Sequence, residues 1–437
     1  MLLEMKDEAE IVIAISADDI ERSKRRGDLG ITYDDDTLRL IDAFRGIGLY
    51  IGSVVLTHYR GQAIADKFQH RLEALGVKVY RHYIIPDYPS NIPLIVSDDG
   101  FGRNDYIETT RSLVVVTAPG PGSGKMATCL SQLYHEHKRG VSAGYAKFET
   151  FPVWNLPLKH PVNLAYEAAT ADLDDVNMID PFHLEAYGVT TVNYNRDVEI
   201  FPVLEAMFKK IYGDSPYKSP TDMGVNMNGF CIFDDDACCE ASKQEIIRRY
   251  YAAACGVRRG TSEPQELRKI ELIMNSLGLT AADRPVVGAA LQRAQETGAP
   301  AVALELADGS IVTGKTSSLL GASSACLLNA LKALAGIDKK LPLIAPGVIE
   351  PIQHLKVEHL GNHNPRLHTD ELLIALSICA VTNPMAGYAI DQLGKLRGCE
   401  AHSSVILSHV DEDLFKKLGV NITFEPKYQA KKLFHKN

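Results

Sequence analysis

Residues 113–140 read LVVVTAPGPGSGKMATCLSQLYHEHKRG. The apolar run at 113–117 predicts a buried strand, the glycine-rich stretch after it a turn, and the residues from Lys125 onward a helix. This order aims backbone N–H groups at an anion, because the first amides of a helix have no partner inside the helix. The segment therefore predicts an α/β domain whose phosphate-binding loop spans residues 120–125.

The loop resembles the Walker A motif G-x-x-x-x-G-K-[ST], with Pro119 at the first glycine position and Met126 at the last position. The resemblance implies ATP or another nucleotide as the cofactor. It assigns phosphate binding to Gly120, Gly122, Ser123, Gly124 and Lys125. Met126 removes the hydroxyl that normally touches magnesium, and Thr128 lies roughly 200° further round the helix, so the loop lacks its usual magnesium ligand. The alternative is a tight turn that binds nothing.

Short β-branched runs alternate with helical stretches from residue 10 to about residue 215. This alternation is typical of a parallel sheet covered by helices. We expect strands at residues 11–15, 50–56, 77–83, 94–96, 113–117, 145–150 and 190–193.

Carboxylates at the ends of two of these strands could complete a phosphate site. Asp18 and Asp19 follow the first strand, and Asp98 and Asp99 follow the fourth. Such residues also serve as helix caps, which is the alternative for both pairs. His183, in the segment DPFHLE, is a candidate for acid–base chemistry, although a loop histidine is often structural. The predicted catalytic residues are Lys125, Asp98 and His183.

Three domains are expected in a chain of 437 residues. Residues 1–215 form a P-loop-like α/β domain, and the segment GDSPYKSPTDMGVNMNG at 213–229 marks its end. Residues 216–284 form a linker and a helical insert, with helical spacing at 236–254 and 263–277. Residues 285–437 form a second α/β domain. Within it we expect a hairpin at 301–313, helices at 323–335, 372–381 and 385–393, and strands at 404–408 and 420–424.

Residues 301–335 resemble the hairpin and helix of cytidine-deaminase-like domains. Laying the deaminase motifs over the chain puts Ala325 at a zinc ligand, Leu327 at the catalytic glutamate, and residues 384–388 at the P-C-x-x-C motif. The resemblance implies a deaminase-like α/β domain that lacks zinc ligands. Candidates for its remaining pocket are Lys315, Asn383, His402 and Ser403.

A histidine cluster lies in residues 354–368, but the helix that would align its members is broken by Asn362, Asn364 and Pro365. Its members are His354, His359, His363 and His368. No H-E-x-x-H motif occurs in the chain. We therefore predict no metal site.

The overall charge is −9, with a sequence pI of about 5.9, which argues against a general nucleic-acid partner. The eight cysteines do not form the dense framework of a secreted disulfide protein. Charged residues interrupt the N-terminus where a signal peptide would be apolar, and no run is long enough to span a membrane. We expect a cytoplasmic homo-oligomer whose partner is a phosphorylated small molecule, without nucleic acid or membrane.

Four segments together resemble one family over essentially the whole chain. They read TAPGPGSGKMATCLSQLYHEHKRG, PVWNLPLKHPVNLAYEAATADL, MIDPFHLEAYG and KLRGCEAHSSVIL. The chain is identified as a member of the uncharacterised bacterial protein family 0371, domain of unknown function 1846. The resemblance implies a cytoplasmic multidomain α/β protein with no agreed activity, and relatives with several dozen residues before the equivalent of Met1.

Three functions follow from these features. The first is a nucleotide-dependent enzyme that transfers or activates a phosphoryl group on a small metabolite, for which a phosphate cradle is required. The second is a non-catalytic nucleotide-sensing or scaffold protein, because Met126 and the missing zinc ligands are typical of a protein that has lost catalysis but kept the shape of its binding sites. The third is a transferase that uses the C-terminal pocket.

Overall fold

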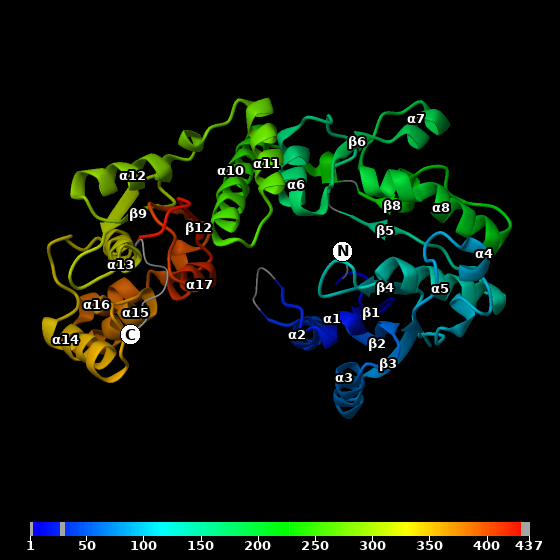
Figure 1. Cartoon of the computed structure of the whole chain (residues 1–437), viewed down its shortest axis with the longest axis horizontal. Coiled ribbons are helices and arrows are strands. Elements are labelled where there is room, and N and C mark those ends of the chain that lie inside the picture. The colour runs from blue at the N-terminus through cyan, green and yellow to red at the C-terminus, as the bar shows by residue number, and fades with distance from the viewer. Residues whose placement is uncertain (1–2, 27–30, 150, 227, 430–437) are drawn as a thin grey trace. The chain divides into compact units, whose positions relative to one another are not determined.

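The computed structural model describes residues 3–26, 31–149, 151–226 and 228–429. It divides into two compact units (Figure 1). The N-terminal unit comprises Met1–Thr150 and Met178–Met227, and the C-terminal unit comprises Phe151–Asn177 and Asn228–Asn437. Thr150 and Met227, which fall in the predicted segments 145–150 and 213–229, lie outside the described residues. Across the described ranges, no helix is both long enough and apolar enough to cross a membrane.

The N-terminal unit is built on a four-stranded parallel sheet in the order β3-β2-β1-β4. Its strands are β1 (Ala9–Ser16), β2 (Tyr50–Tyr59), β3 (Lys78–Tyr83) and β4 (Leu113–Thr117). Every residue of β1 is buried. Ile11, Ile13 and Ile15 pack on the face that carries helices α1 (Ala17–Glu21), α2 (Tyr33–Gly46) and α3 (Ala63–Ala74), and Val12 packs on the opposite face. Burial on both faces explains the continuous apolar sequence of β1.

The order of the strands creates a switch in direction beside β1. The chain moves outward from β1 to β2 and β3, and then returns to place β4 on the other side of β1. In open α/β sheets, ligands bind at the carboxyl edge where neighbouring strands lead away in opposite directions. The segment that follows β4 at this edge is the glycine-rich stretch, and α5 (Lys125–Lys138) begins at its end.

The rest of the N-terminal unit packs around α5. Phe201 and Leu204 of helix α8 (Asn195–Tyr212) share a core with Leu130 and Leu133 of α5. The smaller elements are β5 (Lys147–Phe148) paired with β8 (Gly224–Val225), β6 (Asn177–Ile179) paired with β7 (Val192–Tyr194), and helices α4 (Ile92–Ile95), α7 (Pro181–Tyr187) and α9 (Pro220–Met223), with the 3-10 turn Phe101–Arg103.

The predicted strand at residues 94–96 is wrong, because this segment belongs to the short helix α4. Asn91 caps this helix by accepting a hydrogen bond from the amide of Leu94, and Pro93 lies in its first turn. Proline there is compatible with a helix start, and three apolar residues do not distinguish a strand from a helix. The strand predicted at 145–150 is present only as Lys147–Phe148.

Three helices of the C-terminal unit form one packed group. They are α6 (Pro161–Ala169), α10 (Asp235–Arg259) and α11 (Pro264–Leu277), and their shared core includes Leu164, Ile247 and Ile270. The two long helices confirm the helical spacing predicted at 236–254 and 263–277.

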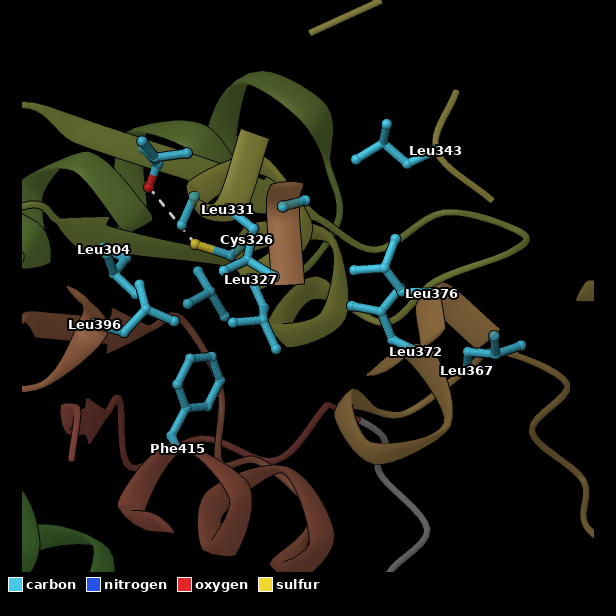
Figure 2. Packing of buried hydrophobic residues seen from close by; sticks show 14 of the residues in the cluster. Leu304, Cys326, Leu327, Leu331, Leu343, Leu367, Leu372, Leu376, Leu396 and Phe415 are labelled. Atoms are coloured by element: carbon cyan, nitrogen blue, oxygen red, sulfur yellow. Dashed lines mark hydrogen bonds between the residues drawn. The ribbon is translucent and has the colours of Figure 1, made fainter. Parts of the chain in front are cut away.

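The C-terminal sheet has the order β10-β9-β11-β12. Strands β9 (Ala301–Glu305) and β10 (Ile311–Lys315) form the predicted antiparallel hairpin, β11 (Glu400–Ser403) is antiparallel to β9, and β12 (Asn421–Phe424) is parallel to β11. Helix α12 (Pro285–Thr297) packs on Ala303 at one face. The other face carries α13 (Ala322–Leu334), α15 (Thr369–Ala380) and α17 (His409–Lys417), with α14 (Pro346–His354) and α16 (Pro384–Ile390) nearby. Figure 2 shows side chains of this cluster, among them Leu327, Leu331, Leu372, Leu376 and Phe415.

The strand predicted at 404–408 is wrong, because the strand of this region is β11, four residues earlier. Ser408 instead begins α17, where its hydroxyl accepts a hydrogen bond from the amide of Asp411. The apolar run after Ser404 gave the stronger sequence pattern, whereas β11 reads EAHS and includes buried polar residues.

Gly314 allows α13 to lie directly against β10. A Cβ atom at this position would stand 2.1 Å from the backbone nitrogen of Cys326, which cannot move independently of the helix. Gly314→Ala is expected to lower the free energy of unfolding of the C-terminal unit by about 1 to 3 kcal/mol. Gly387→Ala in α16 is the matched control, because a Cβ there meets nothing within 4 Å. Urea unfolding checks this pair, and equal stability of the two variants would contradict the close contact.

Candidate functional site

Residues 119–124 form the turn between β4 and α5, and we call them the glycine loop. Gly122 and Gly124 have φ angles of +76° and +83°, in the region that favours glycine, and Gly124 is the N-cap of α5. The hydroxyl of Ser123 donates to the carbonyl of Gly120 at 2.9 Å, and the hydroxyl of Thr57 donates to the carbonyl of Ser123 at 2.8 Å. Since β1 separates β2 from β4, the bond to Thr57 anchors the loop across the carboxyl end of β1.

The amides of the glycine loop and of the first turn of α5 are free of protein acceptors. Among the described residues, none of the amides from 122 to 127 donates a hydrogen bond, and the first that does is Thr128, to the carbonyl of Gly124 at 2.9 Å. Gly124 offers no side chain that could cap the helix. The N-terminus of a helix carries about half a positive charge, so these amides favour an anion.

The glycines alone do not require a ligand. A Cβ atom on Gly120 would lie 2.3 Å from the hydroxyl of Tyr33, and one on Gly124 would lie 3.0 Å from the side chain of Thr57. Packing therefore explains two of the three glycines. The free amides and Lys125 are the features that packing leaves unexplained.

The ammonium group of Lys125 lies over its own loop. Its Nζ is 3.4 Å from the carbonyl oxygen of Gly120, and no carboxylate in the described part of the chain lies within ion-pair distance of it. The surrounding protein displaces water from this ammonium group and lowers its pKa, and the positive charge of Lys147 lowers the pKa further. A bound anion would offset both effects on the pKa of Lys125.

A compact charged cluster surrounds Lys147 of β5. Its ammonium group pairs with Glu149 at 2.6 Å and with Asp197, and it donates to the hydroxyl of Tyr194 at 2.6 Å. Burial raises the pKa of Glu149, and the charge of Asp197 raises it further. Neither acid was predicted from the sequence, because both lie in segments remote from the glycine loop along the chain.

The ends of β1 and β2 supply further polar groups to the same edge of the sheet. His58 has a φ angle of +51° at an irregularity in the pairing of β2 with β3, and its Nδ1 lies 3.3 Å from the hydroxyl of Ser16. Strained residues of this kind concentrate at functional sites. Asp18 accepts hydrogen bonds from Arg60 at 2.7 Å and Gln62 at 2.9 Å, so its charge is already paired.

The structure does not bring Asp98 to the glycine loop. Its carboxylate accepts from the hydroxyl of Tyr134 at 2.7 Å and pairs with Lys138 at 3.0 Å. These two residues are at the far end of α5, and a rise of 1.5 Å per residue separates Lys138 from Lys125 by roughly 20 Å along the helix. The hydrogen bond from Tyr134, followed by that from Lys138, lowers the pKa of Asp98.

His183 lies in α7 and pairs locally. Its Nδ1 is 2.9 Å from the hydroxyl of Ser219 and 3.7 Å from a carboxylate oxygen of Asp222. Asp180 caps the same helix by accepting from the amides of Phe182 and His183. The polar contacts of His183 thus hold α7 against the start of α9.

The residues proposed for a C-terminal pocket have separate roles. Asn383 caps α16, Ser403 donates to the carbonyl of Val405 at 2.7 Å, and Lys315 is exposed at the end of β10. His402 is fully buried, with Nδ1 2.8 Å from the hydroxyl of Thr423 and Nε2 3.4 Å from Glu425.

One group of three potential metal ligands occurs within the ranges that the structure describes, and it consists of His160, Asp235 and Cys239. The Nδ1 of His160 accepts from the amide of Val162 at 3.3 Å, and its Nε2 lies 3.1 Å from Asp235 and 3.6 Å from the sulfur of Cys239. His160 is the N-cap of α6, so its ring also holds the start of that helix.

Lys125 is expected to titrate at a lower pH than Lys138, although both lie on α5. The pKa of Lys125 is lowered by loss of water and by Lys147, whereas the hydrogen bond to Asp98 raises the pKa of Lys138. A bound anion favours the protonated amine and should move the Lys125 titration to higher pH. Carbon-13 NMR of reductively methylated lysines checks the order, and a Lys125 that titrates with or above Lys138 would contradict it.

Comparisons with known proteins cover both units of the chain. Residues 1–278 match the family model described as domain of unknown function DUF1846, N-terminal, and residues 282–434 match the corresponding C-terminal model. The chain is similar to a UPF0371 protein of Streptococcus pneumoniae serotype 19F (strain G54), with 59% identity over 436 residues that cover 100% of this chain and 88% of that protein. It is also 60% identical to a UPF0371 protein of Streptococcus thermophilus (strain ATCC BAA-491 / LMD-9), with the same coverage. The chain therefore belongs to the DUF1846 family, and both of these relatives carry the name UPF0371 protein.

Proposed function

We propose that the N-terminal unit binds the phosphate group of a nucleotide or another phosphorylated small molecule at residues 120–125. The observation that carries the proposal is the run of amides from 122 to 127, which lacks protein acceptors in the described chain and lies beside the unpaired ammonium group of Lys125. Phosphate oxygens accept hydrogen bonds from free backbone amides and ammonium groups of this kind. Those donors make this site P-loop-like in its chemistry.

The position of the loop in the sheet supports the same proposal. The loop lies at the carboxyl edge, between strands whose connections lead away on opposite sides. Small ligands occupy this position in open α/β sheets because the backbone ends there leave a crevice. The negative net charge of the chain favours a small phosphorylated ligand over nucleic acid.

Magnesium held in the Walker manner does not fit this loop. Met126 packs against the core shared by α5 and α8 and has no hydroxyl. Thr128 is fully buried, and its hydroxyl has no partner among the described residues. Neither residue would supply a ligand to a metal in the loop.

For the reaction, we propose transfer or activation of a phosphoryl group on a small metabolite. Lys125 would neutralise charge on the phosphate. The charge of Lys147 acts on Lys125, so Glu149 and Asp197, which pair with Lys147, are the acids that we assign to proton transfer or to positioning of the acceptor. Asp98 and His183 contact structural partners elsewhere, so we assign this role to Glu149 and Asp197 instead.

The second function is binding of a nucleotide without turnover, as in a sensor or scaffold. The missing hydroxyl at position 126 favours it, because magnesium normally accompanies phosphoryl transfer. The two functions differ in one measurement. Release of phosphate or diphosphate above background supports the enzyme, and its absence together with saturable binding supports the sensor.

For the C-terminal unit, we propose a deaminase-like fold without zinc chemistry. The hairpin β9–β10 precedes α13, and Ala325 and Leu327 occupy the positions expected for a zinc ligand and the catalytic glutamate. The proposal assigns no catalysis to Lys315, Asn383, His402 or Ser403.

Thermal unfolding with matched ligands tests phosphate binding. ATP, AMP, inorganic phosphate and adenosine are compared, since adenosine shares the base and sugar but lacks phosphate. A phosphorylated ligand at a hundred times its dissociation constant should stabilise the unit by about 2.7 kcal/mol. If adenosine stabilises the protein as much as ATP and AMP do, or if none of the ligands has an effect, the proposal is wrong.

A further inference from the structure

A cavity of about 170 Å³ lies in the C-terminal unit at the beginning of α13. Gly321, Ala322 and Ser323 line it from the helix, and Arg366 and His368 line it from the segment before α15. None of these residues belongs to the glycine loop of the N-terminal unit.

The first turn of α13 has free amides, and two of the residues that carry them, Ala322 and Ser323, line this cavity. In the chain as described, the amides of Ala322, Ser323 and Ser324 donate to no acceptor, and the first bond of the helix runs from Ala325 to the carbonyl of Gly321 at 2.9 Å. Gly321 is the N-cap and has no side chain to satisfy them. The helix is 13 residues long, so its N-terminus carries a developed partial positive charge.

Ser323 provides an independent indication of a ligand. The residue is only 2% exposed and lines the cavity, and within the described residues its hydroxyl has no hydrogen-bond partner. The neighbouring Ser324, by contrast, donates to the carbonyl of Leu367 at 2.8 Å. The hydroxyl is not sealed in the core but open to the cavity, so a ligand there can accept its hydrogen bond.

The side chains opposite the helix add donors with positive charge. Arg366 uses its Nε to donate to the carbonyl of Ser317 at 2.7 Å, and its two Nη groups have no acceptor in the described structure. The Nδ1 of His368 lies 3.0 Å from Asp411 and 3.3 Å from the hydroxyl of Ser408, and its Nε2 has no hydrogen-bond partner among the described residues. Asp411 also lines the cavity, and its negative charge is offset by His368 and by hydrogen bonds from the amide of Thr369 at 2.9 Å and the hydroxyl of Ser408 at 2.8 Å.

We propose that this cavity binds the phosphate group of a small phosphorylated molecule. The amides of Ala322 and Ser323, the hydroxyl of Ser323 and the Nη groups of Arg366 match a tetrahedral anion with three terminal oxygens better than a carboxylate with two. Pockets for drug-sized ligands measure roughly 300 to 1,000 Å³, so a cavity of about 170 Å³ is small for a whole nucleotide and suits a phosphate with few additional atoms.

The test uses the full chain with Lys125→Ala, so that the glycine loop does not contribute. Inorganic phosphate and glycerol 3-phosphate are titrated by calorimetry, and hydrogen exchange of residues 321–328 and 364–370 is followed. Both segments should gain protection, and tighter binding of one probe tells whether the ligand is the free ion or an ester. Arg366→Gln should weaken binding at least about tenfold, and Ser323→Ala several-fold.

Arg268→Gln is the matched control, because it removes the same charge from an exposed position of α11 in the same unit. The proposal is overturned if neither probe protects these segments, or if Arg366→Gln binds as tightly as Arg268→Gln. The assignment to a small phosphate would be overturned if acetate bound as tightly as inorganic phosphate. It would also be overturned if ATP competed with the two probes at the same concentration.

Discussion

Lys125→Ala is expected to weaken binding of a phosphorylated ligand to the N-terminal unit about 10- to 150-fold. The estimate corresponds to about 1.5 to 3 kcal/mol, the typical contribution of a hydrogen bond to a charged group. Lys125 has no carboxylate partner in the described chain, so its removal leaves no unpaired acid behind. The fold should therefore survive, and thermal stabilisation by ATP should be largely lost while the melting temperature of the free protein is unchanged.

Lys138→Ala is the control for this variant. It removes a lysine from the opposite end of the same helix, where the partner is Asp98. Ligand binding should remain at the level of the unmodified protein. Equal loss of binding in both variants would indicate a general effect of charge, and unchanged binding in Lys125→Ala would remove the glycine loop from consideration.

Arg284→Ala is expected to lower the free energy of unfolding of the C-terminal unit by about 2 to 4 kcal/mol, because it removes the donors that satisfy buried carbonyl groups of the sheet. Glu400 keeps Arg248 as a second partner, so the loss of the ion pair adds little. Arg284 is fully buried and pairs with Glu400. It also donates to the hydroxyl of Thr423 at 3.2 Å and to the carbonyls of Ala401 and Asn421 at 3.0 and 2.8 Å. The side chain thus ties the beginning of α12 to strands β11 and β12.

Hydrogen exchange of β11 and β12 during urea titration measures this effect within the C-terminal unit. Lys243→Ala, which breaks an exposed pair with Glu240, should leave the same transition in place. The account of Arg284 fails if its variant unfolds at the same urea concentration as Lys243→Ala.

Long apolar strands were predictable from the sequence. The strands predicted at 11–15, 50–56, 77–83 and 113–117 are confirmed as β1 to β4. For β1 and β2, burial of most residues on both faces demands a continuous apolar run. Two short elements were not predictable. Two of the three residues at 94–96 lie in helix α4, and β11 contains the buried polar residues His402 and Ser403 that no apolar pattern reveals.

The candidate site was predictable only where it is local in the sequence. The turn before α5 and the position of Lys125 at the head of that helix follow from the order of strand, glycines and helix. The cluster of Lys147, Glu149 and Asp197 depends on contacts between distant segments, and so does the anchoring of Ser123 by Thr57. Acids after a strand, such as Asp98, could not be assigned to an edge of the sheet before the strands were placed.

The C-terminal cavity illustrates the same limit. The start of α13 was predicted within one residue, and this start supplies the free amides. Arg366 and His368 reach the cavity from a loop 43 or more residues further along the chain, and Ser323 stands out only because its burial and missing partner are visible in the structure.

The most direct test of the central claim is the response of the loop glycines to a phosphate ligand. In protein labelled with nitrogen-15 glycine, the amide signals of Gly120, Gly122 and Gly124 are assigned by substitution and followed by NMR as ATP or inorganic phosphate is added. Binding at the glycine loop predicts saturable shifts of Gly122 and Gly124 that need about 10- to 150-fold more ligand in Lys125→Ala. Shifts confined to other glycines, or signals of Gly122 and Gly124 that stay fixed while the ligand binds, would contradict the account.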